Sequence, residues 1–114
     1  MKIVINKCYG GFGLSHEAML LYGKLKGLNL VWEVDESKLC YYYIGEISDD
    51  THFADWEIER NDPFLIQVVE ELGKNANGRS AELKIVNVPD DIKGWSIEDY
   101  DGIESIHECH RVFK

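Results

Sequence analysis

The sequence predicts an α+β fold in which two main helices pack on a small antiparallel or mixed sheet. Two segments place apolar residues at the spacing of a helix face and are followed by glycine, a pattern typical of amphipathic helices. Several shorter segments are rich in β-branched and aromatic residues and are bounded by Gly, Pro, Asn or Asp, as strands joined by turns are. The 114 residues, 45% of them hydrophobic, suffice for one core but not for two full domains, so we expect a single domain over residues 1–114.

The first strand and the first helix are separated by a glycine-rich segment. Residues 2–6 are apolar and mostly β-branched, which predicts a strand. Ser15 is a candidate N-cap for a helix over residues 16–26, and Gly27 stands directly after it, where glycine commonly ends a helix.

The next part of the chain predicts a hairpin. Residues 30–34 and 39–47 have strand compositions, with three consecutive tyrosines in the second segment, and a polar turn separates them. Because side chains alternate between the two faces of a strand, at least one face presents tyrosine outside the core. Residues 52–61 mix aromatic and charged residues without a clear period, and we expect a loop or a short strand there.

Asp62 and Pro63 predict the start of the second helix, since an acidic N-cap followed by proline at the first helical position is a strong start signal. Apolar residues then recur with a 3.6-residue period, and Gly73 ends the helix. Residues 74–80 have the composition of a loop, and residues 82–88 predict a strand.

The C-terminal part of the chain leaves two interpretations open. Residues 95–100 alternate as a strand does, and Asp101-Gly102 is a dipeptide typical of tight turns. In residues 103–113, the spacing of the apolar residues fits one face of a helix, whereas the turn signal fits a hairpin with a returning strand.

The charge of the chain argues against extended polyanions as partners. The chain carries 12 Lys and Arg against 21 Asp and Glu, a net charge of -9 at pH 7, so duplex nucleic acid and anionic membranes are repelled on average. No stretch approaches the about 18 consecutive apolar residues of a membrane span. A small anion is still compatible with this charge, because backbone amides and a few arginines can hold it locally.

The cysteines and the start of the chain favour a cytoplasmic location. Cys8, Cys40 and Cys109 cannot all pair with one another, and the first residues lack the apolar run of a signal peptide. Both features are typical of a protein in a reducing compartment.

The glycine-rich segment 9–13 is the most suggestive local feature. Glycines let backbone amides approach a ligand, and the N-terminus of the following helix attracts anions. The segment matches neither G-x-x-x-x-G-K-[ST] nor G-x-G-x-x-G. A tight turn between strand and helix is therefore the competing interpretation.

The arginines of the chain are Arg60, Arg79 and Arg111, each near a helix end or in a loop. Arginine holds phosphate through a rigid fork. With 6 Tyr, 4 Phe and 3 Trp in the chain, a pocket that stacks a base and holds a phosphate could be built. Three surface arginines in local ion pairs are the alternative.

We predict no metal, no cofactor and no catalytic residue. His107, Cys109 and His110 lie close together, but their spacing is not that of a zinc site. A nucleophilic pair would need Cys8 or Cys109 within hydrogen-bond reach of a histidine, and no pattern in the sequence indicates such a pair.

Blocks along nearly the whole chain resemble small proteins encoded by tailed phages. They are KCYGGFGLS near the start, RNDP, VVEELG and ANGR in the middle, and LKIV, YDGIE and HR near the end. This group is similar to the first type of Thoeris anti-defence protein, which sequesters a cyclic ADP-ribose signal. The resemblance implies a small α+β oligomer that binds a signalling nucleotide without cleaving it, and some family members also bind cyclic oligonucleotides.

The resemblance carries over a set of ligand-binding residues by position. It implies contacts from the glycine loop, the start of the second helix, the loop after that helix and the C-terminal segment, namely Gly10, Gly11, Phe12, Arg60, Asn61, Asn77, Arg79, His110 and Arg111. The chain ends Val112-Phe113-Lys114 where the family pattern has a small polar residue and a tryptophan. No contact is therefore carried over for Val112 and Phe113.

We therefore expect a cytoplasmic, non-enzymatic phage counter-defence protein that sequesters a cyclic ADP-ribose-type or cyclic oligonucleotide signal. A homo-oligomer with sites near subunit contacts is expected, because a domain of this size has little room to enclose a dinucleotide. Two other functions stay open. One is a small hydrolase of the same ligands with His110 or an Asp as general base, and the other is an acidic protein that blocks a host nucleic-acid-binding defence factor.

Overall fold

The computed structural model describes residues 1–108 and 111–114 and has the expected α+β architecture. The helices are α1 (His16–Lys26) and α2 (Pro63–Leu72), with the short 3-10 helices η1 (Asp55–Glu57) and η2 (Gly73–Ala76). The strands are β1 (Lys2–Asn6), β2 (Leu30–Val34), β3 (Cys40–Ile44), β4 (His52–Phe53), β5 (Leu83–Asn87), β6 (Ser96–Tyr100), β7 (Ile103–Glu108) and β8 (Arg111–Phe113).

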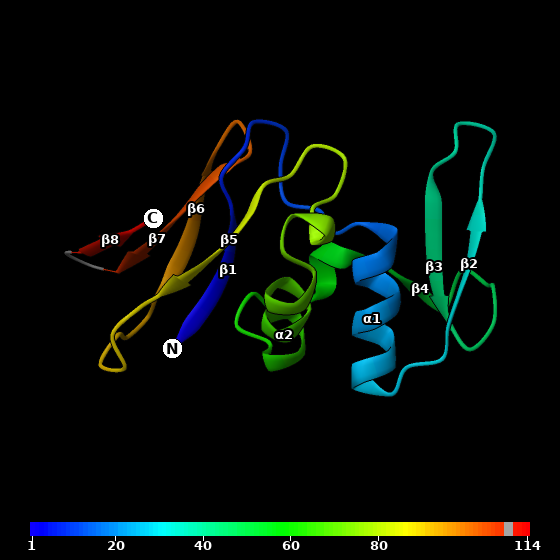
Figure 1. Cartoon of the computed structure of the whole chain (residues 1–114), viewed down its shortest axis with the longest axis horizontal. Helices are drawn as coiled ribbons and strands as arrows, with labels where there is room; N and C mark the ends of the chain where they lie inside the picture. Colours follow the sequence, from blue (N-terminus) through cyan, green and yellow to red (C-terminus); the bar gives the residue numbers. More distant parts are fainter. Residues whose placement is uncertain (109–110) are drawn as a thin grey trace.

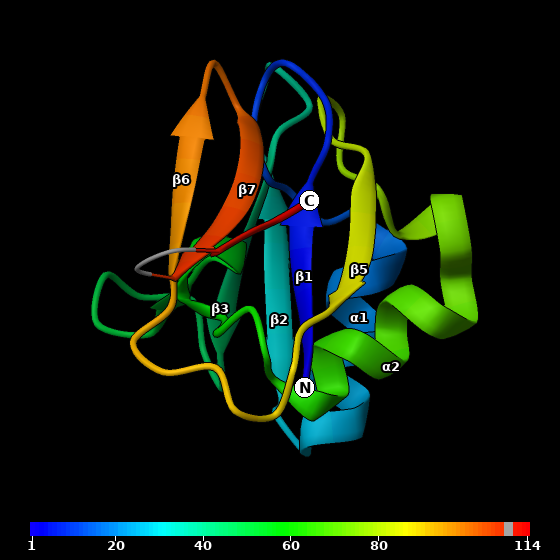
Figure 2. The same ribbon diagram turned by 90° about the vertical axis from the view of Figure 1, so that its left-hand side faces the viewer.

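The strands form three antiparallel sheets, β1–β5, β2–β3–β4 and β6–β7–β8. Figure 1 shows them as layers along the long axis of the molecule, with the two helices between the β1–β5 pair and the β2–β3–β4 sheet. Figure 2, turned by 90°, shows β7 next to β1. The β1–β5 pair therefore packs against the helices on one face and against the C-terminal sheet on the other.

Two apolar cores lie on the two faces of β1. Val4 packs on the helix side, in a cluster that includes the buried side chains of Met19, Tyr22, Leu65 and Val68. The opposite face contributes Ile3 and Ile5 to a second cluster, with Val86, Val88 and Ile106. Because β1 is covered on both faces, its sequence is a continuous apolar run and does not alternate.

The termini of both helices lie where the sequence predicts them. Ser15 Oγ accepts a hydrogen bond of 3.1 Å from a backbone amide of the first turn of α1. Gly27 ends this helix with a φ of 75°, a conformation that favours glycine. At α2, Asp62 accepts a hydrogen bond of 2.8 Å from the Phe64 amide, and Pro63 takes the first helical position. These predictions from local side-chain chemistry are confirmed.

The C-terminal segment forms a returning strand, so the helix interpretation of residues 103–113 is wrong. Strands β6 and β7 pair across Asp101 and Gly102, whose φ values are 51° and 94°. Two consecutive positive φ values match the twist that a two-residue hairpin requires. Strand β8 then pairs with β7, while Cys109 and His110 lie outside the described residues.

Three segments differ in detail from the expected elements. Residues 74–80, expected as a loop, begin with the 3-10 helix η2. The second hairpin strand ends at Ile44 and does not reach residue 47, because Gly45 follows with a φ of 86° that interrupts the extended backbone. Residues 52–61, expected as a loop or a short strand, contain the two-residue strand β4 and the 3-10 helix η1.

The N-cap Asp62 also ties α2 to α1. Its carboxylate accepts hydrogen bonds from Tyr22 Oη (2.7 Å) and Lys26 Nζ (3.2 Å). Burial by itself would raise the pKa of Asp62, but the hydrogen bonds outweigh burial and hold this pKa below its ordinary value. Because the pKa is depressed in the folded state, the carboxylate stabilises the fold above about pH 4, and this contribution is lost as the pH falls.

Replacing Asp62 by Asn keeps the helix cap and removes the charge. We expect the free energy of unfolding of Asp62→Asn to lie about 1 kcal/mol below that of the wild type at pH 7, and this gap to close below about pH 4. Urea denaturation at about pH 7 and about pH 3 measures both values. An equal gap at the two pH values would contradict the stabilising role of the ionised carboxylate.

Candidate functional site

Three loops meet at one end of the molecule, at the top of Figure 1. They are residues 7–13 after β1, residues 77–82 before β5 and the β6–β7 turn at residues 101–102. The first of them contains the glycine-rich segment that the sequence singles out. We refer to the three loops together as the loop end.

Backbone contacts hold the loop end together. The Gly10 amide donates to the Asp101 carbonyl (3.1 Å), and the Gly78 amide donates to the Gly13 carbonyl (2.9 Å). A Cβ atom on Gly78 would lie 2.7 Å from the carbonyl carbon of Gly13. The two backbones therefore approach so closely that a side chain at position 78 would force them apart.

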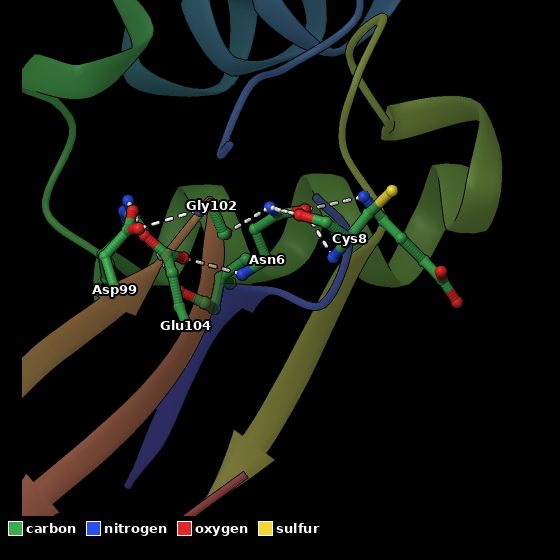
Figure 3. Close-up of polar contacts among 8 residues, drawn as sticks. Asn6, Cys8, Asp99, Gly102 and Glu104 are labelled. Carbon is green, nitrogen blue, oxygen red and sulfur yellow. Dashed lines mark hydrogen bonds and ion pairs between the residues drawn. The ribbon is translucent and has the colours of Figure 1, made fainter. Parts of the chain in front are cut away.

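Asn6, at the end of β1, is the side chain that joins all three loops. It is fully buried. Its Nδ2 donates to the carbonyls of Cys8 (2.7 Å) and Gly102 (2.6 Å), and its Oδ1 accepts from the Glu82 amide (2.8 Å). Figure 3 shows the side chain between Cys8 and Gly102. The single buried amide group of the Asn6 side chain thus binds backbone groups of all three loops, and buried polar groups are costly when they lack partners.

Glu104 on β7 is the second buried polar side chain of this region, at 4% exposure. Its Oε1 accepts a hydrogen bond from the backbone amide of Asn6 (2.7 Å). Its two carboxylate oxygens bind the guanidinium of Arg60 at 2.6 and 2.8 Å. The guanidinium also lies over the ring of Phe12, 3.6 Å from its centroid. Asn6, Glu104 and Arg60 form what we call the Asn6–Glu104 network, in which the Arg60 fork and one face of Phe12 are occupied by the protein itself.

The loop end brings together six of the residues predicted to bind a ligand: Gly10, Gly11, Phe12, Arg60, Asn77 and Arg79. The two glycines have φ values of 120° and 115°. The Asn77 side chain accepts a hydrogen bond from the Leu83 amide (2.9 Å). Arg79 is exposed, and in the described part of the chain it forms no ion pair. Among these six, Arg79 is therefore the one whose charge is available to a ligand.

The other predicted residues lie elsewhere. Asn61 is half-buried near the N-terminus, with Nδ2 3.9 Å from Met1 Sδ. Arg111 is at the opposite end of β7 from the loop end, where its guanidinium pairs with Glu108 (2.6 Å) and Asp91 (3.4 Å). His110 lies outside the described residues.

Sequence reasoning missed Asn6 and Glu104, the residues on which the loop end depends. The hairpin interpretation contained a signal for one of them, because it places Glu104 on the same strand face as the apolar Ile106. A carboxylate on a core-facing position needs a cationic partner, and Arg60 supplies it. For Asn6, no local pattern distinguishes a buried asparagine from one that starts a turn.

A serine–histidine contact lies away from the loop end, on the outer face of the C-terminal sheet. Ser105 Oγ is 2.7 Å from His107 Nε2, and Glu98 Oε2 is 3.5 Å from the same nitrogen. In a catalytic triad the carboxylate binds the other ring nitrogen and orients the imidazole, so this contact lacks the geometry of a triad. Within residues 1–108 and 111–114, no group of three His, Cys, Asp or Glu side chains is arranged to hold a metal ion.

No protein-family model, curated protein or solved structure matches the chain. Among the described residues, neither helix combines the length and apolar character needed to cross a membrane.

Replacing Asn6 by Asp tests whether its amide holds the loop end. In the variant, a carboxylate oxygen replaces the Nδ2 group that donates to the carbonyls of Cys8 and Gly102. Because this oxygen is buried and faces two acceptors, we expect the free energy of unfolding to fall by about 3 to 5 kcal/mol. Asn29→Asp makes the same chemical change at an exposed position and should stay within about 0.5 kcal/mol of the wild type. Chemical denaturation of both variants gives the comparison, and equal small losses would show that Asn6 does not carry this role.

Proposed function

We propose that the protein is a phage counter-defence protein that acts in the cytosol of the infected cell. It binds a cyclic ADP-ribose-type or cyclic oligonucleotide immune signal and holds it without cleaving it. The resemblance of the sequence blocks to tailed-phage proteins of this kind supports the proposal. The observation that carries it is the convergence of the glycine-rich loop and the Asn77–Arg79 block at the loop end, with the Arg79 side chain exposed.

Arg79 is the phosphate-binding residue in this proposal. Its guanidinium can hold a phosphate by a charged, bidentate hydrogen bond. Tyr9, on the neighbouring loop and 65% exposed, offers a ring on which a base can stack. Phe12 is less suited to this stacking role, because the Arg60 guanidinium already covers one face of the Phe12 ring.

Arg60 has a positioning role in the proposal. If its fork turned to a phosphate, Glu104 would be left buried without its cationic partner, and breaking a buried ion pair in this way costs about 3 to 5 kcal/mol. The Arg60–Glu104 pair instead keeps β7 against β1, and with them the loops from which Tyr9 and Arg79 project.

The proposal includes a homo-oligomer. A strand of the length of β7 spans roughly 17 to 20 Å, and Arg111 lies at its far end from the turn of the loop end. Arg111 would therefore contribute to a ligand held at the loop end from a second copy of the chain. A second copy would also enclose a ligand that one small domain leaves open to water.

Replacing Arg79 by Ala should weaken binding of the signal by about 10- to 150-fold, because a charged hydrogen bond to phosphate is worth about 1.5 to 3 kcal/mol. Isothermal titration with a panel of cyclic ADP-ribose isomers and cyclic di- and trinucleotides measures the effect. Lys24→Ala is the matched control, since it removes one exposed charge at the opposite end of α1 and should bind as the wild type does. Equal affinity of both variants would remove Arg79 from the site.

Native mass spectrometry followed by denaturation tests whether the protein cleaves its ligand. Recovery of the intact ligand after stoichiometric binding is expected, together with a mass that gives the number of subunits. A converted product would contradict the proposal and favour the hydrolase. Failure of the whole panel to bind would overturn it and favour the acidic inhibitor, whose partner binding should weaken sharply with added salt.

A further inference from the structure

A second candidate site lies on the other side of α1 from α2, between this helix, β3 and the segment from β4 to η1. A cavity of about 270 Å³ opens there. Its walls are largely aromatic, with Tyr42 from β3, His52 and Phe53 from β4, and Trp56 from η1. The loop end and the cavity share none of their residues.

The charge of the cavity differs from that expected of a phosphate site. Asp55 contributes a carboxylate to the lining, and none of the described residues that line the cavity is a lysine or an arginine. The carboxylate is held in place because its Oδ2 accepts a hydrogen bond from the Leu14 amide (3.0 Å). Burial, Cys40 and Asp55 together raise the pKa of Tyr42 well above its ordinary value, so its hydroxyl stays uncharged.

Trp56 provides the observation that points to a ligand. It is 75% exposed, although tryptophan buries most of its surface in typical folds. It stands beside Asp55 at the cavity, with its ring centroid 6.5 Å from that of His52. An exposed indole next to a carboxylate and other rings is the composition of sites that recognise organic cations, because the ring faces are electron-rich.

We propose that this cavity binds an organic cation, a quaternary or protonated amine, between the aromatic rings and the Asp55 carboxylate. The positive group lies against the exposed ring of Trp56, and Asp55 supplies the opposite charge. The net charge of -9 attracts cations to the protein as a whole. The same charge and the Asp55 carboxylate repel a phosphate from the cavity, so this site does not depend on the proposed nucleotide function.

Choline and its uncharged isostere 3,3-dimethylbutan-1-ol test the charge requirement, because the two ligands have nearly the same shape. We expect choline to bind about tenfold more tightly than the isostere, with choline-dependent chemical shift changes at the Trp56 indole in NMR titrations. Equal affinity for both ligands, or no binding of choline, would overturn the assignment of a cation site.

Three variants locate the binding. Trp56→Ala and Asp55→Asn should each weaken choline binding about tenfold. The asparagine retains an oxygen to accept the Leu14 hydrogen bond, and the exposed position of Trp56 makes its removal tolerable to the fold. Tyr100→Ala is the control, since Tyr100 is a 73% exposed aromatic residue on β6 and lies outside the cavity.

The outcomes separate this inference from the proposed function. Arg79→Ala should bind choline as the wild type does, whatever its effect on nucleotides. Unchanged choline affinity in both Trp56→Ala and Asp55→Asn, or a loss in Tyr100→Ala equal to theirs, would contradict the cavity as the site.

Discussion

The structure depends on the burial of two polar side chains, Asn6 and Glu104, at the place where β1 meets β7. Polar groups removed from water destabilise a protein unless they find partners. Apart from Cys8, the partners here come from distant parts of the chain. The side-chain amide of Asn6 joins β1 to the glycine-rich loop, to the start of β5 and to the β6–β7 turn. Glu104 binds the guanidinium of Arg60. The loops of the candidate site therefore have one arrangement in which all of these groups are satisfied.

The features that the sequence predicted correctly are those that local chemistry decides. Ser15 and Asp62 cap their helices with their own side chains, and the Asp101-Gly102 turn follows from conformations that few other residue pairs adopt. The choice between helix and strand after that turn could not be made locally, because it depends on pairing with β6. The Asn6–Glu104 network could not be predicted for the same reason, since Asn6 and Glu104 are 98 positions apart in the chain. Of the candidate site, the glycine-rich loop and Arg79 could be identified from the sequence, whereas the occupation of Arg60 and Phe12 by the protein itself could not.

The two candidate sites have opposite electrostatic character and adjoin the same segment of the chain. Gly13 contacts Gly78, next to Arg79, and the following residue, Leu14, donates its amide to Asp55 in the aromatic cavity. The backbone next to Arg79 and the Asp55 carboxylate are thus both held where the glycine-rich loop enters α1. The hydrogen bond from the Leu14 amide holds the Asp55 carboxylate in place without a ligand, which reduces the entropy lost on binding.

Hydrogen exchange of the native protein tests most directly whether the Asn6–Glu104 network fixes the loop end. The backbone amide of Asn6 donates to the Glu104 carboxylate, and the backbone amide of Glu82 donates to the Asn6 side chain. The Val4 amide, which donates to the Arg60 carbonyl inside the core, is the reference. If the network is as stable as the core, the Asn6 and Glu82 amides exchange only when the whole protein unfolds, with the same free energy of opening as the Val4 amide. Exchange of the Asn6 and Glu82 amides through openings of clearly lower free energy, with Val4 still protected, would contradict this account.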